Sequence, residues 1–235
     1  AGDDGTYAYE LPSSAASAPS APRLLFHREG RDLPDAETSL LVADDRCFIG
    51  LGVGGNALVQ FDSLTGIELR RISTPHPVFA PPALRGEWLY VGMGAGDYTN
   101  PAIAKAGAVW CVRADSLKVE WKRELPGTVL GAVMVDDRQV VVGCGDGRVV
   151  ALDHAGHIIA TWDTGAPLAA SLALTPDFIY GINQAGKLFA IDRRAGEIAW
   201  QVEVGRPGHY MSGPVIVGER LLFGTPYDGL MCYGP

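Results

Sequence analysis

The chain has 235 residues, of which 47% are hydrophobic and 20% are charged, a balance typical of a folded globular protein. Its formal net charge of −8 argues against a nucleic-acid backbone as the partner. No apolar run reaches the roughly 18 residues that a membrane-spanning helix needs, so no membrane span is predicted.

Residues 1–22 are expected to hold one strand and a loop. Within them, DGTYAYE at 4–10 reads as a strand, and SSAASAPSAP at 13–22 has the low complexity of a loose surface loop. The next segment, RLLFHRE at 23–29, is an apolar strand that precedes the repeats of the chain. We expect it to pair with the last sheet as its outer strand and so to close a ring of sheets, because closure hides sheet edges.

One segment recurs along the chain. Its clearest copy is LFAIDRRAGEIAW at 188–200, weaker copies lie at 58–71, 109–121 and 149–162, and TYAYELP and LMCYGP are half-copies. One position in these copies is held by Ala8, Gln60, Cys111, Ala151, Ala190 and Cys232, at intervals of 52, 51, 40, 39 and 42 residues. A period near 40 in strand-rich units indicates the blades of a β-propeller.

Each unit reads as four antiparallel strands, called A to D here from the axis to the rim. In the clearest unit they are 171–175, 177–182, 187–192 and 197–204, with glycine in the connecting turns. Pairs of A and B strands are expected at 38–51, 78–92, 130–143, 168–182 and 212–224. The prediction is a single all-β domain over residues 1–235, a β-propeller of about five four-stranded blades. The alternative is part of a six- to eight-bladed propeller, in which residues 4–10 belong to a further blade.

The repeated motif has a physical explanation in its clearest copy, Ala190-x-Asp192-x-x-x-Gly196-x-x-x-Trp200. The small residue lets the C strand pack under the neighbouring blade, the Asp accepts backbone N–H bonds in the C–D turn, and the Gly forms that turn. The Trp is a large apolar plate that fits between blades, so Trp200→Ala is expected to cost about 3–5 kcal/mol. The residues assigned to blade packing are Trp121, Trp200, Asp153, Asp192, Gly156 and Gly196.

This motif resembles the PQQ repeat of quinoprotein-type β-propellers. FAIDRRAGEIAW matches it closely, VVALDHAG and VWCVRADSLKVEW match it in part, and the resemblance extends from about residue 38 to residue 233. The family includes quinone dehydrogenases, which hold pyrroloquinoline quinone with calcium, and non-catalytic propellers of the bacterial envelope. The resemblance implies a bacterial protein in a periplasmic or other extracytoplasmic setting.

Several features separate this chain from the dehydrogenases. It is shorter than an eight-bladed enzyme, it has no adjacent pair of cysteines, and the calcium-binding set of Glu, Asn and Asp cannot be placed on it. The cysteines, Cys47, Cys111, Cys144 and Cys232, stand in no C-x-x-C motif and are interpreted as small buried residues. We therefore predict no catalytic residue, no metal and no cofactor, with PQQ and calcium as the alternative.

A candidate binding face follows from propeller geometry, in which the B–C and D–A loops lie on one face of a rigid scaffold. The B–C loop at 92–107 is the longest of its kind. The candidate residues on this face are His76, Asp97, Tyr98, Asn100, His209, Tyr210, Tyr227 and Asp228. Such a set suits a peptide or a small polar ligand; the competing interpretation is that each His only bonds a loop carbonyl.

These features favour a non-catalytic binding or protein-interaction module of a bacterial envelope protein or of a larger complex. A protein or peptide is the expected partner. The alternative is a fragment or subunit of a PQQ-type oxidoreductase, or another propeller enzyme with a cofactor on its axis. The enzyme needs an axial pocket with at least three convergent carboxylate or amide oxygens, whereas an interaction module needs an apolar or aromatic surface patch.

Overall fold

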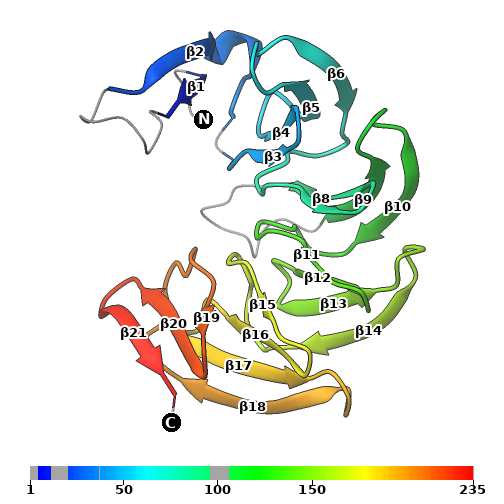
Figure 1. The fold of residues 1–235 in the computed structure, drawn as a ribbon. Helices are drawn as coiled ribbons and strands as arrows, with labels where there is room; N and C mark the ends of the chain where they lie inside the picture. Colours follow the sequence, from blue (N-terminus) through cyan, green and yellow to red (C-terminus); the bar gives the residue numbers. More distant parts are fainter. Residues whose placement is uncertain (1–4, 12–20, 37, 96–105, 235) are drawn as a thin grey trace. The chain divides into compact units, whose positions relative to one another are not determined.

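The computed structural model describes residues 5–11, 21–36, 38–95 and 106–234. Apart from one short 3-10 turn, η1 (Gly30–Asp32), the regular elements of these residues are antiparallel β-strands (Figure 1). The predicted all-β fold is therefore confirmed. The chain divides into two compact units, Ala1–Pro81 and Pro82–Pro235, and each is described by itself.

The first unit contains a strand pair and a four-stranded sheet. The pair is β1 (Thr6–Glu10) with β2 (Arg23–Arg28), and the sheet has the order β3 (Leu41–Ala43), β4 (Arg46–Leu51), β5 (Ala57–Asp62) and β6 (Glu68–Ser73). Buried side chains of β4 and β5 form the core with Leu33 and Ala36, which follow η1. Phe26 of β2 packs edge-on against Phe61 of β5, with ring centroids 6.0 Å apart, so β2 is joined to the sheet that follows it in the chain.

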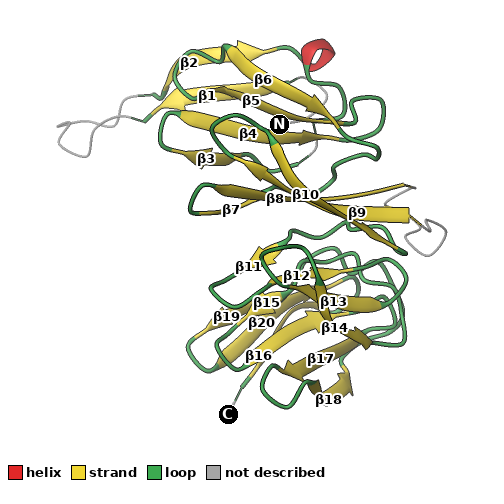
Figure 2. Ribbon diagram, turned by 90° about the vertical axis from the view of Figure 1, so that its right-hand side faces the viewer, coloured by secondary structure: helices red, strands yellow, loops and turns green. Residues whose placement is uncertain are grey.

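The second unit contains four sheets, each built from strands in chain order (Figures 1 and 2). Each of the first three sheets has four strands. The first contains β7 (Ala83–Arg85), β8 (Trp88–Ala95), β9 (Ala106–Arg113) and β10 (Val119–Leu125), and the second contains β11 (Met134–Val135), β12 (Val140–Gly143), β13 (Arg148–Leu152) and β14 (Ile158–Asp163). The third contains β15 (Ala173–Leu174), β16 (Phe178–Ile182), β17 (Lys187–Asp192) and β18 (Glu197–Glu203). The last sheet has three strands among the described residues, β19 (Val215–Val217), β20 (Arg220–Thr225) and β21 (Gly229–Tyr233). The predicted four-stranded propeller blades are confirmed, and these sheets are called blades below.

The B and C strands of a blade are buried, whereas the D strand is largely exposed. In the β15–β18 blade, β17 is buried from Leu188 to Ile191, but β18 is exposed at most positions. Neighbouring blades share their cores, as Val109 of β9 does with Val150 of β13. Because each blade hides the apolar face of the next, the B and C strands read as continuous apolar runs in the sequence.

Each of the five C–D strand pairs in the described ranges carries the same irregularity. The register shifts directly after the small-residue position of the motif, held by Ala8, Gln60, Cys111, Ala151 and Ala190. Such a β-bulge bends the outer strand and increases its twist. Because β1 and β2 share the bulge, they have the pairing of the C and D strands of a blade.

This pairing bears on residues 23–29, which are predicted to complete the last blade. In the structure β2 is hydrogen-bonded to β1, and β1 holds the edge of β2 that a C strand takes in the other blades. The pairing agrees with the alternative, in which residues 4–10 belong to a further blade. The closing of a ring by residues 23–29 and the single domain over residues 1–235 stay predictions.

Candidate functional site

The predicted loop face is described best where two loops of the second unit meet. The β18–β19 loop lies against the β20–β21 turn, where Gly208 leaves room for Tyr227. A Cβ atom at Gly208 would lie 3.0 Å from Tyr227 Cε2, so a larger residue would push the two loops apart. Glycine at this position therefore keeps the aromatic and acidic side chains of the turn beside the loop.

Tyr227 presents an accessible aromatic ring on this face. It is 53% exposed, its hydroxyl donates to the carbonyl of Pro207 at 3.3 Å, and the guanidinium carbon of Arg206 lies 4.6 Å from its ring centroid. His209 and Asp228 are also exposed. Arg206, His209, Tyr227 and Asp228 form a polar and aromatic surface, called the loop patch below.

Tyr210, another predicted binding residue, is part of the core. It is 1% exposed and packs with Phe223, and its hydroxyl donates to the carbonyl of Arg206 at 2.9 Å. Burial, followed by the negative charge of Asp228, raises the pKa of the Tyr210 hydroxyl. Tyr210 thus holds the loop in place, and its ring is not available to a ligand.

The other predicted residues are His76, Asp97, Tyr98 and Asn100. His76 belongs to the first unit, where its carbonyl accepts a hydrogen bond from Thr74 Oγ1 at 2.7 Å. Asp97, Tyr98 and Asn100 lie outside the described residues. The patch adds Arg206, whose only signal in the sequence is its place in GRPGHY, the same loop that supplied His209.

The motif residues connect a D strand to the C–D turn of the next blade. At the joint between the β7–β10 and β11–β14 blades, Trp121 Nε1 donates to the carbonyl of His154 at 2.8 Å. Its ring covers Gly156, where a Cβ atom would lie 2.7 Å from Trp121 Cδ2. Two residues after Trp121, Arg123 Nε donates to the carbonyl of Gly156 at 2.7 Å. The turn is therefore held through its backbone carbonyls.

The same arrangement recurs at two other joints. Trp162 of β14 donates from Nε1 to the carbonyl of Gly196 at 2.8 Å, and in the first unit Arg28 Nη1 donates to the carbonyl of Gly66 at 3.0 Å. Phe26 covers Gly66 as Trp121 covers the equivalent glycine. At each of the three joints, one accepting carbonyl belongs to a glycine of the C–D turn with positive φ.

The motif Asp shapes the C–D turn that is held in this way. Asp192 Oδ1 accepts hydrogen bonds from the backbone N–H groups of Arg194 and Ala195, both at 2.8 Å, and Asp153 accepts bonds in its own turn. These backbone N–H bonds hold the pKa of both carboxyls below its usual value.

Trp200 has the motif position of Trp121 but a different environment. It is 40% exposed, and its ring centroid lies 6.1 Å from that of Tyr180. The groove beside it is lined by Thr175, Tyr180, Ile216, Gly218, Glu219, Arg220, Leu221, Tyr233 and Gly234. The expected burial between two blades is not found for Trp200, because the β19–β21 blade brings no C–D turn against it within the described ranges.

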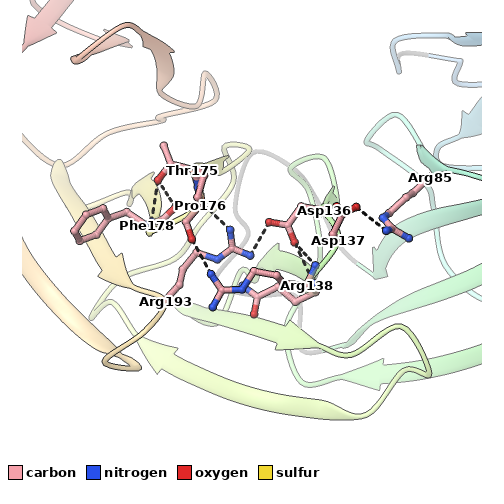
Figure 3. Close-up of polar contacts among 9 residues, drawn as sticks. Arg85, Asp136, Asp137, Arg138, Thr175, Pro176, Phe178 and Arg193 are labelled. Atoms are coloured by element: carbon pink, nitrogen blue, oxygen red, sulfur yellow. Dashed lines mark hydrogen bonds and ion pairs between the residues drawn. The ribbon is translucent and has the colours of Figure 1, made fainter.

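Ion pairs between turns form a second set of contacts between blades (Figure 3). Arg85 of β7 lies 2.6 Å from Asp137, in the turn between β11 and β12. Asp136 of the same turn lies 2.6 Å from Nη2 of Arg193, in the turn between β17 and β18. In the sequence, the two aspartates carry only the signal of an A–B turn.

The pair of Asp136 and Arg193 is the more buried of the two. The side chain of Arg193 is 1% exposed, and its Nη1 donates to the carbonyl of Thr175. Burial by itself raises the pKa of the Asp136 carboxyl, but the N–H of Arg138 and the guanidinium of Arg193 outweigh it and lower the pKa. These contacts join neighbouring blades.

The described residues also bear on metals, membranes and thiols. Across them, no group of three or more His, Cys, Asp or Glu side chains is placed to hold a metal ion. None of the helical segments described is long and apolar enough to cross a membrane. The cysteines are free, and Cys47, Cys111 and Cys144 are buried. Cys232 is exposed, contrary to its interpretation as a small buried residue.

Comparisons with known proteins agree with this architecture. BamB of Nitrosomonas eutropha, an outer membrane protein assembly factor, is 25% identical over 156 aligned positions, and the match covers 64% of this chain and 35% of that protein. The crystal structure of BamB from Moraxella catarrhalis matches 90% of this chain and 62% of that chain, with a TM-score of 0.71 and 17% identity, and so shows the same fold. The chain spans less than two thirds of the length of either relative.

The comparison with family models covers more of the chain. The model described as outer membrane protein assembly factor BamB matches residues 58–234, which is more than half of the chain. The resemblance to PQQ-repeat propellers, and to their non-catalytic members rather than the quinone dehydrogenases, is thereby confirmed. The chain belongs to the PQQ-repeat family described as outer membrane protein assembly factor BamB.

Proposed function

We propose that this chain is a non-catalytic binding module of the bacterial envelope, on the periplasmic side, that holds a protein partner during the assembly of outer-membrane proteins. Family membership supports the setting, since the curated relative is an outer membrane protein assembly factor. A propeller suits this role because its rigid blades carry loops that can differ freely in sequence. The module needs no cofactor.

The loop patch is the proposed contact surface. The observation that carries this choice is Tyr227, which is 53% exposed while Arg206 is held 4.6 Å from its ring centroid. Tyrosine and arginine dominate the binding energy of protein interfaces, because each offers a large contact area together with hydrogen-bonding groups. Asp228 adds a negative charge next to this pair, so the partner would be an extended peptide segment with both polar and aromatic side chains.

Complementation tests the proposal. The chain, given an export signal, would be produced in a Gram-negative strain that lacks its own family member, and folded outer-membrane proteins would be quantified. We expect partial restoration, and loss of it in the double variant Arg206→Ala, Tyr227→Ala. Ile158→Ala is the matched control, because Ile158 is 47% exposed on a D strand away from the patch. Equal restoration by the double variant would remove the loop patch from the proposal.

Titration with PQQ and calcium distinguishes the proposed non-catalytic module from the alternative of a PQQ-type enzyme. We expect no shift of the quinone absorbance and no rise in the unfolding temperature when both are added to the purified chain. A ligand that binds only the native state stabilises it by an amount that grows with the logarithm of the free ligand concentration above the dissociation constant. An unfolding temperature that rises in this way would instead favour a cofactor site and contradict the proposal.

A further inference from the structure

A groove of about 570 Å³ lies in the second unit, where the β7–β10 blade meets the C–D turn of the β11–β14 blade. This volume is within the range of small-ligand sites. The aromatic residues that line it are Trp88, Tyr90 and Trp121, and its charged lining residues are Arg85 and Glu120. It is called the aromatic groove below.

The aromatic side chains of this groove are held by contacts of their own. Tyr90 is 1% exposed, and its hydroxyl lies 3.0 Å from His154 Nδ1. The ring centroid of Trp121 lies 6.0 Å from that of Tyr90, and Trp121 Nε1 donates to the carbonyl of His154 at 2.8 Å. The guanidinium carbon of Arg113 lies 5.1 Å from the ring centroid of Trp88. One indole of the groove thus already receives a cation.

Glu120 reaches the groove through the β-bulge of its blade. Val119 pairs with Val112 and Trp121 pairs with Cys111, so Glu120 is the extra residue of the bulge. Because a bulge re-aims a side chain, Glu120 lines the groove together with its neighbour Trp121. The extra residue is apolar in the other four described bulges, where it is Leu25, Leu69, Ile159 or Ala199. The packing of blades therefore does not require an acid at this position.

The charge of Glu120 is not balanced within the described residues. Arg85, the other charged lining residue, lies 2.6 Å from Asp137 (Figure 3), and Arg113 lies 2.5 Å from Glu87. In contrast, no described residue forms an ion pair or a hydrogen bond with the carboxylate of Glu120. An unpaired carboxylate beside aromatic rings attracts a cation, because the carboxylate and the ring faces both carry negative potential.

We infer that the aromatic groove binds an alkylammonium group, either the side chain of a lysine in a partner protein or a free amine of the same chemistry. The carboxylate of Glu120, which is exposed, holds the ammonium at the mouth of the groove. The methylene stem lies against the indoles of Trp88 and Trp121. A lysine suits this arrangement because its flexible four-carbon stem is buried along apolar surface while its compact charge stays near water.

This site is independent of the loop patch. The aromatic groove lies at A–B and C–D turns, to which Arg85 and His154 belong, whereas the loop patch lies at the B–C turn and the D–A loop of other blades. The groove also uses a feature that the repeat does not supply, the acid at the bulge. The two proposals can therefore fail separately.

An NMR titration of the isotope-labelled chain tests the inference through the indole N–H signals of Trp88 and Trp121. The probes are Nα-acetyl-lysine-N-methylamide and cadaverine, and Nα-acetyl-norleucine-N-methylamide is the uncharged control with the same four-carbon stem. We expect saturable shifts of both signals with the lysine probe, and binding at least about tenfold weaker for the norleucine control, because it lacks the charge. Tighter binding of the lysine probe than of cadaverine assigns the groove to a partner protein, and the reverse order assigns it to a free amine.

Two matched variants test the role of the carboxylate. Glu120→Gln keeps the shape of the side chain and removes its charge, so it should weaken the lysine probe at least about tenfold. Glu124→Gln makes the same change at an exposed residue of β10 that does not line the groove, and it should change binding by less than about twofold.

Three results would overturn the proposal. They are the lack of a saturable shift with both amines, equal binding of the norleucine control, and equal losses in Glu120→Gln and Glu124→Gln. Equal losses would mean that the net negative charge of the chain, and not this groove, attracts the amine. None of these outcomes depends on Arg206 or Tyr227, so the loop patch is tested separately.

Discussion

Two joints of the second unit use the same residue types and differ in one respect. Between the β7–β10 and β11–β14 blades, Trp121 lies against a complete C–D turn and donates to its backbone at 2.8 Å. Between the β15–β18 and β19–β21 blades, the following blade has three described strands, and Trp200 is 40% exposed. The indoles therefore have equal places in the repeat and unequal surroundings.

The difference teaches that the blade after a motif residue decides what that residue does. The stabilising contacts of Trp121 come from His154 and Gly156, which lie more than thirty residues further along the chain. Ion pairs follow the same rule, since Arg85–Asp137 and Asp136–Arg193 each tie a blade to its neighbour. Within the part of the chain that the structure describes, no ion pair reaches the β19–β21 blade.

The largest expected effect on stability comes from replacing the two indoles, Trp121 and Trp200. Trp121→Ala should lower the free energy of unfolding by about 3 kcal/mol, because it removes an aromatic plate between blades and leaves the turn carbonyl unpaired. Trp200→Ala should lower it by about 1 kcal/mol, because much of this ring is already in water. Urea unfolding of both variants measures the difference. Equal losses would mean that the exposed indole is packed as tightly as the inner one.

A smaller effect is expected at the ion pairs of the A–B turn. Asp136→Ala leaves the buried guanidinium of Arg193 without its partner and should cost about 2 kcal/mol, less than a fully buried pair because Asp136 is partly exposed. Asp137→Ala is the control and should have little effect, because its side chain is 94% exposed. Thermal unfolding of the two variants measures both losses, and equal losses would contradict the larger role of Asp136.

The stability that Asp136 contributes is expected to depend on pH. The pKa of Asp136 is lowered in the folded chain, so its contribution is fully present above the ordinary pKa of an Asp and is lost as the pH falls through the folded value. The stability difference between the unchanged chain and Asp136→Ala should therefore shrink progressively below about pH 4. A difference that stays constant down to pH 2 would exclude an ionised Asp136 as its source.

The fold could be predicted from the sequence because each blade repeats local signals. The spacing of Ala151 and Ala190, the glycine turns and the continuous apolar B and C strands all depend on residues close together in the chain. The partner of β2 could not be predicted in this way, because an apolar strand carries no label for the edge that it joins. The bulge after Ala8 shows that β2 pairs with β1 as a D strand pairs with a C strand, and a bulge is visible only in the pairing register.

The candidate site was predictable only in part, for a related reason. Tyr227 and Tyr210 are both tyrosines of loops on one face, yet one is 53% exposed and the other is 1% exposed. Their difference depends on packing against Phe223 and on the loop glycines, which no local pattern encodes. Arg206 was missed because it joins the candidate site only through its guanidinium, which lies over the ring of Tyr227 from another loop.

A still smaller difference in stability is expected between substitutions of two turn glycines. Gly156 and Gly196 both have positive φ, so Ala at either position should cost about 1 kcal/mol of backbone strain. At Gly156 a Cβ atom would also meet the indole of Trp121 at 2.7 Å, whereas at Gly196 nothing lies within 4 Å. Gly156→Ala should therefore be worse than Gly196→Ala by about a further 1 kcal/mol. Equal losses in chemical denaturation would show that backbone strain alone accounts for both glycines.

The smallest perturbation compares two cysteines that hold the same position of the repeat. Cys111 is 2% exposed between β8 and β10, and burial raises the pKa of its thiol to about 11. Cys232 stands on β21, whose outer edge has no described neighbour, and is exposed. Because the thiolate must form and be reached for alkylation, iodoacetamide at pH 8 should modify Cys232 at least about a hundredfold faster than Cys111. Mass spectrometry of the native chain follows both sites without any substitution. Slow labelling of Cys232 would show that its thiol is not accessible, and it would remove the contrast between the two joints.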